Sequence, residues 1–189
     1  MLSVSEYAKK FDMAVLAQDT TESVIRTGCE RARDYRVAAY YTTPTWTPLV
    51  AEILHGSDVH VGVALAFPYG TQTTRVKETE IHEALEVGGT EIRTATRMGV
   101  DHGVDHVKTA TGSAVLPDVR HLEVMTSALG GRTRLKLSGV FRTIALAATL
   151  WMLDMGVDLI GTRSAPDLVD QYRAHVETAR AAAKIPARV

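Results

Sequence analysis

The sequence predicts an α/β protein built around a parallel sheet. Short apolar or β-branched runs alternate with segments of helical periodicity along the chain, which is the pattern of parallel strands connected by helices. The runs are almost continuously apolar, as expected for strands that are covered on both faces. Periodicity alone does not distinguish a closed barrel from an open, doubly wound sheet.

Seven runs have the length and composition of strands. Turn-forming residues bound them: Pro44 follows the second run, and Pro68 and Gly70 end the third. The predicted strands are residues 13–17, 36–42, 59–67, 91–95, 106–109, 134–137 and 159–162.

Six segments with helical periodicity lie between or after these runs. In the first, Val24, Ile25 and Cys29 fall on one face, behind a Thr and a Glu that suit a helix start. Gly56 and Gly156 follow the ends of two others, as glycine commonly does at a helix C-terminus. The predicted helices are residues 20–34, 49–55, 73–87, 116–129, 143–155 and 167–183.

Length and composition are those of an ordinary globular protein. A chain of 189 residues fits one domain spanning residues 1–189, and 46% apolar with 23% charged residues is typical of folded chains. A net charge of −1 gives no basis for binding nucleic acid or an anionic membrane. Cys29 is the only cysteine and cannot form an intrachain disulfide. No apolar signal core or membrane-length stretch is present, so we expect a cytoplasmic protein.

Two lysines lie where parallel α/β folds carry their chemistry. Ligands bind at the carboxyl ends of such strands, and Lys108 (in HVKTATG) and Lys136 (in RLKLSGV) fall in predicted strands. Burial and a neighbouring cation both lower the pKa of a lysine, which yields a neutral amine that attacks carbonyls. Alternatively, each lysine extends from a strand edge to solvent or pairs with an acid. The residue pattern leaves both interpretations open.

Three segments resemble the deoxyribose-phosphate aldolase family. In this sequence, FPYGTQTTRVKETEIHEALEVGGTEI resembles the family's third-strand region. DHVKTATG resembles the strand that carries the family's Schiff-base lysine. LKLSGVFRTIALAATLWMLDMGVDLIGTRS resembles the last two units of the family's barrel. FDMAVLAQDTTE and YYTTPTWTPL match more loosely but in order. The resemblance covers nearly the whole chain and implies a TIM-type (β/α) barrel.

The resemblance also implies roles for individual residues. Lys108 corresponds to the lysine that forms the Schiff base, and Lys136 to a second lysine that lowers its pKa. Asp12 matches an aspartate of the first strand that takes part in proton transfer. Thr109 and Thr111 would hydrogen-bond substrate hydroxyls. The implied reaction needs no cofactor and no metal, because the iminium itself is the electron sink.

The chain departs from the family in length. Between Arg97 and Gly103 it lacks one βα unit, so we expect an incomplete or modified barrel of about seven strands. An open parallel edge invites pairing with another chain, which makes a homo-oligomer the expected assembly. At the end of the fourth strand Arg93 stands where the family carries an acid; a cation cannot act as a base there but could hold an anionic group.

The predicted phosphate site and the second strand also differ from the family. Gly139 is followed by Val140 instead of a second glycine, and Arg163 and Ser164 replace a pair of small residues. Arg163 could hold a phosphate or carboxylate, or be a solvated loop residue. Tyr41 replaces a cysteine and would contact substrate, donate a proton or pack. These changes indicate a substrate other than deoxyribose 5-phosphate.

Two further features have simpler interpretations. Asp101, His102, Asp105 and His106 resemble a metal cluster, but they precede a strand at its amino-terminal side and lack a known ligand spacing, so we expect capping and turn residues. Trp151 lies in an apolar helix segment and is predicted to be in the core.

Three functional hypotheses follow. The first is a Schiff-base aldolase or lyase acting through Lys108 on a small aldehyde or ketone, phosphorylated or carboxylated. The second is a different iminium reaction, such as a dehydration or cyclisation in specialised biosynthesis. The third is a non-catalytic homologue that serves as a partner or regulatory subunit. The expected partners are a small carbonyl substrate and further copies of the chain, not nucleic acid or membrane.

Overall fold

The computed structural model describes residues 1–94, 106–108, 122, 126–127, 134–138 and 144–183. In this part of the chain no helix is long and apolar enough to cross a membrane.

In the described part of the chain, seven parallel strands form one sheet, as the sequence predicts. Their order in the sheet is β4-β3-β2-β1-β7-β6-β5, and every pairing is parallel. The strands are β1 (Phe11–Ala14), β2 (Ala39–Thr42), β3 (His60–Leu65), β4 (Glu91–Thr94), β5 (His106–Lys108), β6 (Arg134–Leu137) and β7 (Leu159–Gly161).

The strand order is that of a barrel cut at one seam. The first and last strands are neighbours, because β1 pairs with both β2 and β7, and the order then runs in sequence away from β1 on both sides. The two ends of the order are β4 and β5, the strands that flank the segment with the missing βα unit. The fold is therefore a TIM-type α/β architecture with an incomplete barrel, as expected; residues 95–105, which connect these strands, lie outside the described residues.

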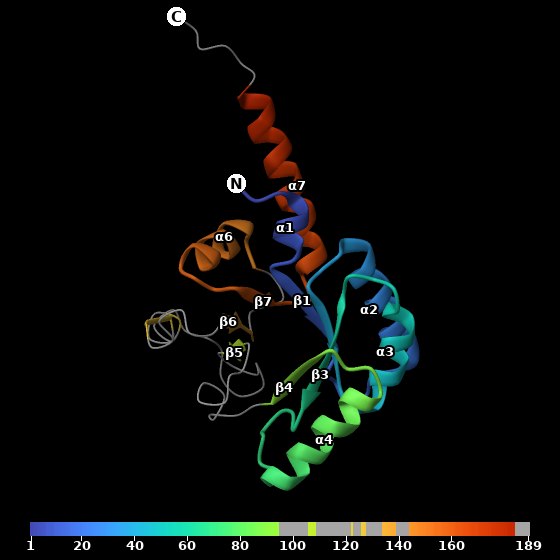
Figure 1. Ribbon diagram of the computed structural model, residues 1–189. Coiled ribbons are helices and arrows are strands. Elements are labelled where there is room, and N and C mark those ends of the chain that lie inside the picture. The colour runs from blue at the N-terminus through green and yellow to red at the C-terminus, as the bar shows by residue number, and fades with distance from the viewer. Residues whose placement is uncertain (95–105, 109–121, 123–125, 128–133, 139–143, 184–189) are drawn as a thin grey trace, which may run out of the picture.

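The helices lie around the outside of the strands (Figure 1). Of the predicted helix at 116–129, only Leu122, Thr126 and Ser127 are described. The elements are α1 (Val4–Ala8), α2 (Glu22–Tyr35), the short 3-10 helix η1 (Pro44–Trp46), α3 (Thr47–Leu54), α4 (Thr74–Glu86), α6 (Leu146–Asp154) and α7 (Ala165–Ala182).

The short helix α1 was not among the predicted elements. Its start carries a capping box: the Ser3 hydroxyl accepts the Glu6 amide at 3.2 Å, and the Ser3 amide donates to the Glu6 carboxylate at 2.7 Å. The Ser-x-x-Glu spacing that builds this cap is visible in the sequence. The helix packs against α7.

Strands β2, β3 and β7 are almost continuously apolar, whereas β1 and β6 carry the buried charged residues Asp12 and Lys136. The face toward the helices carries large apolar side chains that belong to the main hydrophobic core, including Phe11, Met13, Tyr40, Leu135, Leu137 and Ile160. The alternate positions form the opposite face, which we call the inner face. Since side chains alternate along a strand, Asp12, Tyr41 and Lys136 share that inner face.

Several details of the predicted helices are revised. Val24 is 48% exposed and Trp151 45% exposed, so neither belongs to the core. Cys29 is buried, and burial raises the pKa of its thiol to about 12. Gly56 and Gly156 adopt positive φ values of 75° and 93°, as expected for glycine after a helix end.

Candidate active site

A buried ion pair lies on the inner face. Lys136, the third residue of β6, pairs with Asp12, the second residue of β1. The Lys136 side chain is 0% exposed and that of Asp12 2%. Removing a charge from water is unfavourable unless it is paired, so each of these side chains requires the other in the folded protein.

Gly161 makes this pairing possible across the strand that separates the two partners. Strand β7 lies between β1 and β6, and Gly161 is the Cα partner of Asp12. A β-carbon at position 161 would lie 3.2 Å from Asp12 Oδ1 and 3.3 Å from Lys136 Cε. The missing side chain therefore leaves the space in which the ammonium and the carboxylate meet.

Tyr41 forms another side of this cluster. Its ring centroid lies 4.5 Å from Lys136 Nζ, and the residue is 3% exposed. The ring lies directly on Gly62, where an added β-carbon would be 2.5 Å from the ring atoms. The aromatic face gives the buried ammonium a second favourable contact. Tyr41, which the sequence analysis predicted to contact substrate or to pack, therefore packs against Lys136.

Lys108 lies beside this cluster in the backbone register. Strands β5 and β6 pair in parallel, and Lys108 is the Cα partner of Lys136. The two lysines singled out from the sequence are thus on adjacent strands at paired positions, although they lie 28 residues apart in the chain. The register therefore brings the two positions side by side in the sheet.

Ser138 is a site residue that the sequence interpretation missed. Its hydroxyl would lie 3.4 Å from a β-carbon at Gly161, close to Asp12 and Lys136. Its spacing of two residues from Lys136 places it on the same face when the strand continues, which is a signal that the sequence does contain.

The remaining predicted residues are less closely placed. Arg93 is the Cα partner of Ala64 in the β3–β4 pair. Arg163 is exposed just after β7, and Ser164 is the N-cap of α7, with its amide donating to the Thr162 hydroxyl at 3.1 Å. Thr109, Thr111 and Gly139 lie outside the described residues.

The suspected metal cluster falls largely outside the described residues as well, since only His106 of its four members is described. The described part of the chain contains no group of three or more His, Cys, Asp or Glu side chains arranged to hold a metal ion.

The arrangement can hold and relay protons in a site shielded from water. The Asp12 carboxylate and the Lys136 ammonium together carry no net charge, and a proton can reside on either group. A primary amine next to this pair would experience both a nearby cation and a nearby acceptor. This combination suits chemistry that begins with a neutral amine and needs proton transfer at each later step.

The chain is similar to known aldolases in sequence and in fold. No family model matches it. A deoxyribose-phosphate aldolase of Clostridium tetani is 35% identical over 105 residues, which cover 54% of this chain and about half, 49%, of the relative. A deoxyribose-phosphate aldolase of Geobacillus sp. (strain WCH70) is 27% identical over 220 residues, covering 89% of this chain and 96% of the relative.

A solved structure extends the comparison to the fold. The tetrameric deoxyribose phosphate aldolase of Aeropyrum pernix superposes with a TM-score of 0.80 and 21% identity, covering 92% of this chain and 93% of that one. At this level of identity the likeness establishes the architecture, which agrees with the strand order described above.

Proposed function

We propose that this chain, which is similar to deoxyribose-phosphate aldolases, is a Schiff-base-forming, class I aldolase-like carbon–carbon lyase. Lys108 is the proposed nucleophile. The observation that carries the proposal is the buried Lys136–Asp12 pair, with Lys108 as the Cα partner of Lys136.

The proposed reaction begins with the Lys108 amine in its neutral form. The Lys136 ammonium favours that form, since two cations on adjacent strands repel each other. The amine adds to the substrate carbonyl, and loss of water gives an iminium. Cleavage of the bond between the α- and β-carbons then sends its electron pair into the iminium, leaving an enamine. Asp12 accepts the proton of the β-hydroxyl, directly or through water, so that this oxygen becomes the carbonyl of the released aldehyde. Asp12 then returns a proton to the enamine carbon. Hydrolysis of the resulting iminium frees Lys108.

The proposed substrate is a small aldehyde or ketone that carries a phosphate or carboxylate. Arg163 follows β7 in an exposed position, and Ser164 begins α7. A guanidinium next to a helix N-terminus is a favourable environment for an anionic group. Thr109, Thr111, Gly139 and Tyr41 complete the proposed set. Arg93, which replaces an acid, supports a substrate different from deoxyribose 5-phosphate.

The proposed assembly is a homo-oligomer of a single-domain protein, residues 1–189, in the cytoplasm. The sheet ends in β4 and β5, and a parallel sheet end is a natural place for contact with a second copy. The Aeropyrum pernix relative is described as tetrameric. Sedimentation velocity across a hundredfold concentration range tests this part of the proposal: a monomer at every concentration would refute it.

Reductive trapping tests the proposed chemistry. The protein is incubated with acetaldehyde, other small carbonyls and phosphorylated sugars, reduced with borohydride, and analysed by intact mass and peptide mapping. We expect one adduct per chain on Lys108 that is absent from Lys108→Ala. Lys77→Ala, which changes a lysine of α4, is the control and should retain the adduct. Loss of the adduct in both variants, or labelling of the native chain only at surface lysines, would contradict the proposal.

A non-catalytic partner or regulatory subunit is the second candidate function. Arg93 in place of an acid and the incomplete barrel favour it. A folded protein that forms no adduct with any carbonyl would support this role. A dehydration or cyclisation shares the imine with the aldolase and is distinguished from it by the mass of the product released from the carbonyl substrate.

A further inference from the structure

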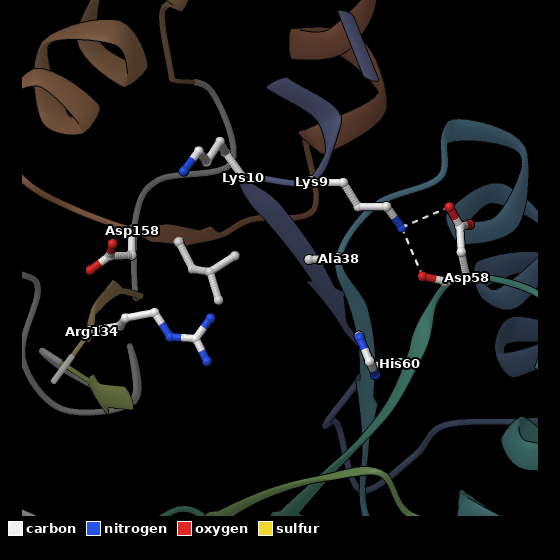
Figure 2. Close-up of a pocket in the computed structure, with 8 residues that line it drawn as sticks. Lys9, Lys10, Ala38, Asp58, His60, Arg134 and Asp158 are labelled. Atoms are coloured by element: carbon white, nitrogen blue, oxygen red, sulfur yellow. Dashed lines mark hydrogen bonds and ion pairs between the residues drawn. The ribbon is translucent and has the colours of Figure 1, made fainter. Parts of the chain in front are cut away.

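A pocket of about 280 Å³ opens at the opposite end of the strands from the proposed aldolase site (Figure 2). Each of its lining residues lies at the first position of a strand or within two residues before it. This end of the barrel carries no part of the proposed reaction. The pocket is lined by Lys9, Lys10, Ala38, Asp58, His60, Arg134, Asp158 and Leu159.

The charges in this pocket favour an anion. Among the described lining residues, three are cations and two are carboxylates. Lys9 approaches Asp58 at 3.2 Å, and Arg36, which is not in the lining, approaches the same carboxylate at 2.7 Å. The pKa of Asp58 is held below its usual value chiefly by its hydrogen bond from Arg36, so this carboxylate stays ionised and is compensated by two cations.

The carboxylate of Asp158, the second acid in the lining, also has a partner within the protein. Asp158 Oδ2 accepts the Leu135 backbone amide at 2.8 Å, which ties it to the wall of the pocket. Figure 2 shows the Arg134 guanidinium pointing toward the middle of the group, with His60 on the facing wall and Lys10 beside Asp158. Donors from β1, β3 and β6 thus line one cavity.

We propose that this pocket binds a small phosphate-bearing ligand, held by Arg134 and Lys10 with His60 as a further donor. A guanidinium offers paired N–H donors that match phosphate oxygens, and a lysine adds a point charge. The cavity has room for a phosphate group together with a few carbon atoms.

The pocket lies directly behind the buried ion pair. Arg134 precedes Lys136 by two residues on β6, and Lys10 precedes Asp12 by two at β1. Two residues of strand span about 6.6 Å, and residues two apart face the same side. A bound phosphate therefore places negative charge within about 7–10 Å of the lysine cluster through the protein interior, where screening by salt is weak.

This proximity has a consequence that rests on the proposed function. A nearby anion stabilises the charged form of a lysine, so a filled pocket lowers the fraction of neutral Lys108 amine. Phosphate then slows imine formation at neutral pH, and the effect diminishes at high pH, where the amine is neutral with or without phosphate. The binding itself does not depend on Lys108.

Calorimetric titration with inorganic phosphate at low ionic strength tests the binding. We expect Arg134→Gln and Lys10→Gln each to weaken binding about tenfold, the usual effect of removing one charged hydrogen-bonding partner. Arg31→Gln, a matched change of an exposed residue on α2, should leave the affinity unchanged. Circular dichroism and urea unfolding establish that each variant is folded; if Arg134→Gln is not, Lys10→Gln decides.

Two further measurements separate this proposal from the proposed aldolase. Arg163→Gln removes the anion-binding residue of the proposed aldolase site and should retain the binding in this pocket, because Arg163 follows the carboxyl end of β7. Lys108→Ala should bind phosphate as the native chain does, even if no imine is ever trapped. Amide chemical-shift changes on adding phosphate should centre on Ala38, His60 and Asp158. Absence of binding, or binding lost in Arg163→Gln but kept in Arg134→Gln and Lys10→Gln, overturns the proposal.

Discussion

Replacing Asp12 by Asn should destabilise the protein by about 4 kcal/mol at pH 7. The change leaves Lys136, which is 0% exposed, without its carboxylate, and removing one partner of a buried ion pair costs about 3–5 kcal/mol. The ammonium can escape this penalty only by losing its proton. Discharging an ordinary lysine at pH 7 spans roughly 3.4 pH units at about 1.36 kcal/mol each, or about 4.6 kcal/mol, which sets an upper limit of similar size.

The converse substitution should cost about as much but respond to pH in the opposite direction. Lys136→Met leaves the Asp12 carboxylate alone, and protonating an ordinary aspartate at pH 7 costs about 4.2 kcal/mol. The Asp12→Asn deficit should shrink as pH rises toward 10, because a lysine of the unfolded chain then also loses its proton. The Lys136→Met deficit should shrink as pH falls toward 4, because an aspartate of the unfolded chain then also gains one.

The double variant provides the decisive comparison. Asp12→Asn combined with Lys136→Met removes both charges, and a neutral, well-packed replacement of a buried pair is often close to native in stability. Urea unfolding followed by circular dichroism should place the double variant within about 1–2 kcal/mol of the native chain. If the two single losses simply add in the double variant, the side chains do not form a coupled buried pair, and this interpretation of the site is wrong.

Three further variants or conditions probe the same interior. Tyr41→Leu should lower the free energy of unfolding by about 1–2 kcal/mol more than Tyr41→Phe, because it removes the aromatic face beside Lys136; equal losses in urea unfolding would exclude that contact. Gly62→Ala should cost about 1–3 kcal/mol through overpacking against the ring, and Tyr41→Ala in the same chain should recover part of the loss. The pKa of Cys29, raised to about 12 by burial, predicts negligible alkylation by iodoacetamide at pH 8 in the folded state and prompt alkylation in urea; it also predicts a contribution to stability that is present below about pH 8.5 and is lost as pH rises toward 12. Rapid alkylation of the native protein would contradict this.

The sequence predicted the number of strands in the sheet because local composition determines where strands form, whereas the barrel arrangement came from the family resemblance. It predicted less about the faces of those strands. The first strand was predicted to begin at residue 13, which left Asp12 outside it. In the structure β1 begins at Phe11, so Asp12 belongs to the strand and lies on its inner face. Trp151 was placed in the core from the apolar character of its neighbours, but an apolar helix segment has an exposed side as well, and Trp151 occupies it.

The partner of Lys136 could not be found from local patterns. Asp12 and Lys136 lie far apart in the chain, and the adjacency of β1 with β7 and of β7 with β6 brings them together. The two side chains have room to meet because residue 161 is a glycine. Nothing in the sequence around Gly161 distinguishes a glycine that is needed for space from one that is needed for a turn. Family resemblance identified both charged residues, but not that they pair.

The position of the seam explains how the chain can lack a βα unit and keep its charge cluster. Asp12, Tyr41, Lys136 and Gly161 come from β1, β2, β6 and β7, which are contiguous in the sheet. The seam lies between β4 and β5, away from these four strands. Lys108 and Arg93 belong to the strands at the two ends of the order. The loss of a unit therefore leaves the Asp12–Lys136 pair in place while removing one neighbour of the strand that carries Lys108. Under the proposed function, whatever pairs with β5 therefore helps to set the position of the nucleophile, which links the expected oligomer to catalysis.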